Sequence, residues 1–90
     1  MSDPRLAHAR ELRLRDAFDQ ARALCHAVLA ERADDAEAMG LLGICDIECG
    51  DPASGRQWLD RAEAADPDNA SVHLYRSVQF EVEGDASAAL

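Results

Sequence analysis

The sequence contains no lysine, and its 9 arginines stand against 18 aspartates and glutamates, which leaves a formal net charge of −9. A strongly acidic chain is repelled by phosphate backbones and by anionic lipid surfaces. We therefore expect no nucleic acid among its partners. Aromatic residues are also scarce, at 4% of the chain, although 48% of the residues are hydrophobic. This composition favours closely packed helices over pleated strands, and it is not the composition of a disordered chain.

Long apolar runs are missing as well. No run approaches the roughly 20 residues that span a bilayer. The arginine-rich segment 1–15 is not followed by the unbroken apolar stretch of an export signal. We therefore expect no membrane insertion and a cytoplasmic location. The 3 cysteines are an odd number in a chain whose helices need no cross-links, which fits a reducing compartment.

Residues that could carry chemistry are few and scattered. The glycines are isolated from one another, so the chain has no glycine-rich phosphate loop. Cys45 and Cys49 lie four residues apart and so share one face of an expected helix, whereas zinc sites use pairs supplied from a turn together with two further ligands. We expect both, like Cys25, to pack as small hydrophobic residues. No histidine has a nucleophile at a suitable spacing, and we predict no catalytic, cofactor or metal site.

Proline and glycine divide the chain at regular intervals. An aspartate directly precedes a proline, the pattern of a capping acid before the first helical residue, at Asp3-Pro4, Asp51-Pro52 and Asp66-Pro67. Gly50 and Gly84 each precede an aspartate, and we expect each glycine to end one helix directly before the next begins. The apolar spacing between these marks predicts helices over 4–14, 17–32, 36–49, 53–65 and 70–83, with a sixth that begins near Ala86.

The same marks recur at one fixed interval. Gly50-Asp51 returns 34 residues later as Gly84-Asp85, and Asp34-Asp35-Ala36 returns at the same interval as Asp68-Asn69-Ala70. A period of 34 residues built from paired helices is the period of the tetratricopeptide repeat. A single helical hairpin cannot bury its apolar flank, so the pattern predicts that hairpins stack on one another.

Residues 36–69 resemble that family position by position. Leu42-Gly43 match its leucine-glycine pair, Gly55 and Ala62 its small positions, and Pro67 its closing proline. Small residues are needed where two helix backbones approach closely. The resemblance implies an all-α fold, a right-handed superhelix of antiparallel helical hairpins in one domain, 1–90. It divides the chain into a degenerate repeat at 2–35, a full repeat at 36–69 and a partial repeat at 70–90.

Two residues of the full repeat depart from the family pattern. Asp46 stands where a tyrosine is usual, and Glu63 where a leucine is usual. Either this hairpin is wetter than average, or Arg56 or Arg61 supplies a partner for these charges. The partial repeat stops at Leu90, early in the expected sixth helix. We therefore expect the chain to be a piece of a longer one, or another copy to cover its open end.

The resemblance also implies a binding groove, because the first helix of each stacked hairpin lines the concave side. The groove positions that carry side chains for a peptide are Arg10, Arg13, Glu37, Leu41, Ile44, Ile47, Glu48, Leu74, Tyr75, Val78, Glu81 and Val82. This surface is mainly apolar with acidic edges, and it favours a peptide with apolar anchors and basic flanks. The groove has no lysine, and Arg10 with Arg13 does not reconstruct the clamp with which some members hold a terminal carboxylate.

Three functions remain open on the sequence. The first is a noncatalytic module that binds a protein or peptide partner in the groove. The second is structural, with the repeats as the scaffold of a larger enzyme or of a secretion or assembly protein. The third is self-association into a homodimer through the open C-terminal face. In addition, residues 1–15 carry 4 arginines against 2 acidic residues, so the basic end could steer a charged partner.

Overall fold

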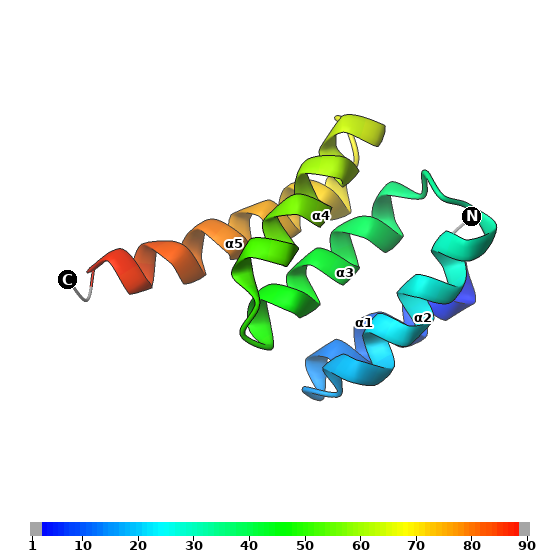
Figure 1. Ribbon diagram of the computed structural model, residues 1–90, viewed down its shortest axis with the longest axis horizontal. Helices are drawn as coiled ribbons and strands as arrows, with labels where there is room; N and C mark the ends of the chain where they lie inside the picture. Colours follow the sequence, from blue (N-terminus) through cyan, green and yellow to red (C-terminus); the bar gives the residue numbers. More distant parts are fainter. Residues whose placement is uncertain (1–2, 89–90) are drawn as a thin grey trace.

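The computed structural model describes the backbone of residues 3–88 and the surroundings of side chains up to residue 84. This part of the chain forms five α-helices: α1 (Pro4–Leu14), α2 (Phe18–Glu31), α3 (Ala36–Glu48), α4 (Pro52–Ala65) and α5 (Ala70–Ala88). The first four agree within one residue at either end with the helices expected from the sequence. Figure 1 shows α1 beside α2 and α3 beside α4 as antiparallel hairpins, with α5 extending away from them at the C-terminal end. The predicted all-α class of stacked hairpins is confirmed.

Aspartate side chains begin three of these helices. Asp3 accepts a hydrogen bond from the backbone N–H of Arg5 at 2.9 Å, and Asp51 from that of Ser54 at 3.2 Å. Asp35 does the same before α3. Each carboxylate satisfies a backbone donor that the helix itself leaves without a partner. The interpretation of Asp3 and Asp51 as caps before a proline is confirmed.

The third aspartate-proline pair does not begin a helix. Asp66 follows the last residue of α4, and Pro67 lies in the turn. Asn69 begins α5 instead, because its side-chain oxygen accepts the backbone N–H of Val72 at 3.1 Å. An asparagine amide oxygen caps a helix about as well as an aspartate does. The expected capping role of Asp66 was therefore wrong, although α5 begins at Ala70, where the expected helix over 70–83 also begins.

Gly50 and Gly84 also behave differently from each other. Gly50 ends α3 with a φ of +107°, a conformation that L residues rarely adopt, and Pro52 follows two residues later. Gly84 lies inside α5, which continues to Ala88, so the helix expected to begin near Ala86 is not a separate element. A single glycine in a helix costs only about 1 kcal/mol relative to alanine. No proline follows Gly84 to enforce the stop, and Leu90 lies outside the described residues.

The core is built around α3. Every residue of this helix from Ala36 to Ile47 except Glu37 is buried, because the other helices surround it. Its hairpin with α4 closes on Gly43 and Gly55, two of the small positions expected from the repeat. A Cβ on Gly43 would lie 2.8 Å from the backbone oxygen of Gly55, and one on Gly55 would lie 2.5 Å from the oxygen of Gly43. Only glycine allows the two backbones to cross this closely.

Candidate functional site

The predicted groove lies along α1, α3 and α5, and both outer helices pack against α3. Its floor is closed. Leu41 and Ile44 are 0% exposed, and Tyr75 of α5 is 3% exposed. Ile47 is also buried, and it packs against Gly55 within the hairpin of α3 and α4. These four residues hold the hairpins together, so a ligand reaches none of them without displacing the core.

Ion pairs between α1 and α3 cover that floor. Arg10 binds the carboxylate of Glu37, and Arg13 Nε lies 2.5 Å from Glu48 Oε1. The guanidinium carbon of Arg13 also lies 5.7 Å from the centroid of the Tyr75 ring, a cation–π distance. The four charged groove residues from these two helices are therefore brought together. Each arginine is paired with a glutamate, so none of the four offers an unpaired charge to a ligand.

The remaining groove residues come from α5 and are open to solvent. Leu74 is 60% exposed and Val82 42% exposed, while Val78 between them is half-buried and Glu81 is exposed. Because Leu74, Val78 and Val82 are four residues apart, they form one stripe along the helix. We call Leu74, Val78, Glu81 and Val82 the α5 strip. Among the residues expected to line the groove, these are the ones that offer apolar surface to a partner.

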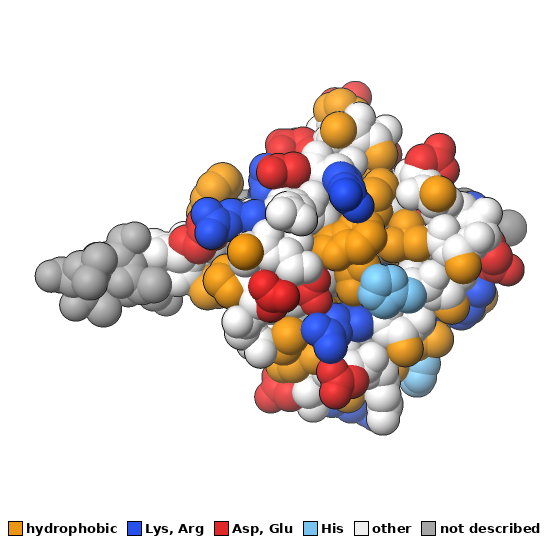
Figure 2. All heavy atoms as spheres, viewed as in Figure 1, with side chains coloured by type: hydrophobic (Ala, Val, Ile, Leu, Met, Phe, Trp, Pro, Cys, Tyr) orange, Lys and Arg blue, Asp and Glu red, His pale blue; other side chains and the backbone are white. Residues whose placement is uncertain are grey.

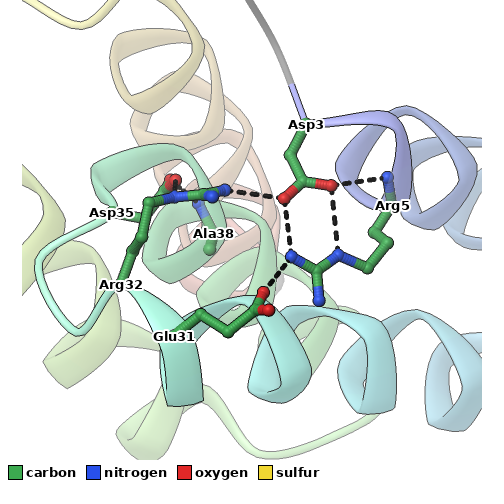
Figure 3. Close-up of polar contacts among 6 residues, drawn as sticks. All are labelled: Asp3, Arg5, Glu31, Arg32, Asp35 and Ala38. Atoms are coloured by element: carbon green, nitrogen blue, oxygen red, sulfur yellow. Dashed lines mark hydrogen bonds and ion pairs between the residues drawn. The ribbon is translucent and has the colours of Figure 1, made fainter.

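Arg5, Arg10 and Arg13, three of the four arginines expected to form a basic end, pair with acidic side chains within the chain. Asp3 accepts hydrogen bonds from Arg5 and Arg32, and Arg5 also binds Glu31 (Figure 3). Arg32 in turn binds Asp35, so the start of α1, the end of α2 and the start of α3 share one network. The side-chain hydrogen bonds from Arg5 and Arg32 hold the pKa of Asp3 well below its usual range. The network joins the first hairpin to the second.

The two departures from the family pattern have partners that sequence reasoning missed. Asp46 is 5% exposed, and its carboxylate accepts hydrogen bonds from Arg22 Nη1 at 3.1 Å and from the Ser54 hydroxyl at 2.9 Å. Glu63 lies 3.2 Å from Arg76. The partners are therefore Arg22 and Arg76, not the expected Arg56 or Arg61. Arg22 comes from the preceding hairpin and Arg76 from the following helix, and no spacing within the repeat signals either contact.

The prediction that all three cysteines are buried is confirmed for two of them and wrong for the third. Cys25 and Cys45 are 0% exposed and belong to the core, as expected. Burial raises the pKa of each thiol to about 12, so both stay protonated at neutral pH. Cys49 is exposed, contrary to the prediction, because it follows the last residue of α3, and its sulfur accepts a hydrogen bond from Arg22 at 3.4 Å. Among the described residues, no group of three or more histidine, cysteine or acidic side chains is placed to hold a metal ion.

Taken together, the described residues define a helical-repeat protein, in which hairpins of similar length stack side by side and share one core. A family model described as tetratricopeptide repeat matches residues 12–77. The chain therefore belongs to the tetratricopeptide repeat family, whose members are generally protein–protein interaction modules and typically noncatalytic. No curated protein and no solved structure gives a significant match. No helix in the described part of the chain is long and apolar enough to cross a membrane.

Proposed function

We propose that this chain is a noncatalytic interaction module that binds a peptide segment of a partner protein along its groove, with the α5 strip as the contact surface. The observation that carries the proposal is the exposure of Leu74 and Val82 in a stripe next to a closed, ion-paired floor. Apolar side chains exposed together along one helix face are typical of a surface that a partner covers.

The chemistry of the peptide follows from what surrounds the strip. Apolar anchors would pack on Leu74, Val78 and Val82, and a basic flank would face Glu81. The proposal retains all twelve groove positions and the division into repeats at 2–35, 36–69 and 70–90. Within it, the buried residues shape the surface and the exposed residues touch the ligand.

The test uses two exposed apolar side chains on the same helix. Leu74 is 60% exposed on the strip, and Phe80 is 62% exposed on a different face of α5. Peptides are selected from a displayed random library on the wild-type chain and then titrated against Leu74→Asp and Phe80→Asp. We expect Leu74→Asp to weaken binding at least about tenfold, since the loss of one buried leucine exceeds 1.4 kcal/mol. Phe80→Asp should bind as the wild type does.

Equal binding by Leu74→Asp and the wild type would contradict the proposal, and so would selected peptides without apolar anchors. Ile44→Asp is unsuitable as a test, because Ile44 is completely buried and its change would unfold the domain.

The exposed Phe80 also favours another candidate function, self-association through the C-terminal face. Light scattering across a concentration series would then show the mass rising towards that of a dimer. Phe80→Asp should abolish the rise, and Leu74→Asp should leave it unchanged. A constant mass at all concentrations would rule this candidate out. If both tests fail, the structural-scaffold function, in which the repeats bind nothing diffusible, is the alternative that remains.

A further inference from the structure

A hollow of about 500 Å³ opens between α2 and α4, with α3 beneath it. Figure 2 shows hydrophobic side chains exposed between these helices, with a histidine and charged side chains of both signs around them. The lining residues that matter for its chemistry are Asp19, Arg22, His26, Asp46, Asp51 and Trp58. The α5 strip plays no part in this hollow.

One wall of the hollow is aromatic. The ring of Trp58 is half-buried, and the ring of His26 meets it edge to face, with centroids 6.1 Å apart and planes at 76°. The guanidinium carbon of Arg61 lies 5.2 Å from the centroid of the Trp58 ring. The indole is therefore already in contact with one guanidinium group, and the face of such a ring is electron-rich.

The polar side of the hollow carries more negative than positive charge. Arg22 is the cation at its base, where Nη1 binds Asp46 at 3.1 Å and Nη2 binds Asp19 at 2.9 Å. The carboxylate of Asp19 remains 94% exposed, and Asp51 is exposed as well. Three carboxylates stand against Arg22 and against Arg61 beside the Trp58 ring, which leaves a net charge of −1 at the hollow in a chain that is acidic overall. An incoming cation is therefore favoured over an incoming anion.

We propose that this hollow is a second docking site, which receives an arginine side chain of a partner protein. The guanidinium group would enter the hollow between the Trp58 ring and the exposed carboxylates of Asp19 and Asp51. A planar guanidinium can stack on a ring and bind carboxylates at the same time, whereas a compact, strongly hydrated lysine ammonium does this less well. The volume exceeds one side chain, so residues beside the arginine fit at the mouth.

The probe is the blocked tripeptide acetyl-Gly-Arg-Gly-amide, titrated into the whole ¹⁵N-labelled chain. Trp58 is the single tryptophan, so its indole N–H gives one assigned NMR signal that reports on the hollow. We expect saturable shifts of that signal and of backbone amides along α2 and α4. The matched peptide with citrulline in place of arginine has the same shape without the charge, and it should cause no saturable shift.

The variants separate local charge from total charge. Asp19→Asn with Asp51→Asn removes two charges at the hollow, and asparagine at position 51 keeps the capping hydrogen bond. Asp34→Asn with Asp68→Asn removes two charges from exposed turns and leaves the same net charge. We expect the first pair to raise the dissociation constant about tenfold, the size expected for two surface charge pairs. The second pair should change it less than twofold.

Three results would overturn the proposal: equal shifts with citrulline, unchanged affinity in the Asp19→Asn, Asp51→Asn chain, or no saturation at the Trp58 indole. A circular dichroism melt of each variant confirms that the fold is retained. The outcome is independent of the proposed groove, because Leu74→Asp should leave the arginine titration unchanged.

Discussion

Replacing Gly55 by alanine should destabilise the hairpin of α3 and α4 at its crossing point. The added methyl group would meet the side chain of Ile47 and would lie 2.5 Å from the backbone oxygen of Gly43. Carbon and oxygen atoms normally approach no closer than about 3.4 Å, so the two helices would have to separate by about 1 Å. A backbone oxygen cannot rotate away as a flexible side chain can, and the clash therefore moves the whole helix.

The size of the effect is the difference between two terms. Alanine gains about 1 kcal/mol over glycine inside a helix, because it restricts the unfolded chain more. Overpacking a well-filled core costs typically about 1–3 kcal/mol, and a contact with backbone lies at the upper end of that range. We therefore expect the free energy of unfolding to fall by about 2 kcal/mol, a large share of the stability of a small domain.

Gly84 provides the matched control for this substitution. It also lies inside a helix, yet a Cβ built on it meets nothing within 4 Å, and its φ is not in the left-handed region. The clash term is therefore absent, and Gly84→Ala should raise the free energy of unfolding by up to about 1 kcal/mol. The same change of residue is expected to have opposite signs at the two positions.

Urea unfolding followed by circular dichroism at 222 nm measures both variants against the wild type. The midpoint should move down for Gly55→Ala and up for Gly84→Ala, with little change in the slope. If Gly55→Ala were as stable as the wild type, the close crossing of α3 and α4 would be refuted. If Gly84→Ala were destabilised, α5 would end at this glycine in a left-handed conformation, and the separate sixth helix expected from the sequence would be restored.

Two further predictions concern thiols and acid. Cys49 should react with Ellman's reagent on mixing, whereas the two core cysteines, whose pKa values burial raises, should react only after unfolding; three fast thiols in the native chain would contradict the packing. The pKa of Asp3 in the folded chain is lowered from its ordinary 3.8, so its ion pairs contribute fully above that pH and are lost as the pH falls through and below it. The free energy of unfolding should therefore fall less steeply between pH 5 and pH 2 in Asp3→Asn than in the wild type, and equal slopes would show that the network does not couple to folding.

Local signals made most of the fold predictable. The capping role of Asp51 depends on its own side chain and on the next few residues, so it can be read from the sequence. The small positions at Gly43 and Gly55 are also readable, because a close backbone crossing excludes any side chain wherever the repeat occurs. The end of α5 was not predictable from Gly84 alone, since glycine permits a stop and does not impose one.

The sequence did not predict which of the expected groove residues would be exposed to solvent. The repeat pattern gives the face on which Leu41 and Leu74 lie, but not what covers that face. Leu41 is buried because it packs in the core with apolar residues of α1, α2 and α5, and the arginines of α1 also reach across to acidic residues of α3. Leu74 is exposed because it lies on a helix with fewer neighbours. These ion pairs join residues about one repeat apart, and their formation depends on side-chain reach as well as position.

Asp46, whose ion-pair partner the sequence did not predict, is one of the residues that line the hollow. An aspartate is much smaller than the tyrosine usual at this position, and here it lies at the wall of the space between α2 and α4. A tyrosine there would fill part of that space and carry no charge, so Arg22 would lose its ion pair with Asp46 and keep the one with Asp19. Aspartate in place of the usual tyrosine at position 46 thus leaves space in the hollow and adds a negative charge to its wall. The departure of Asp46 from the family pattern is therefore explained by its place at the hollow, on the opposite side of α3 from Leu41 and Ile44.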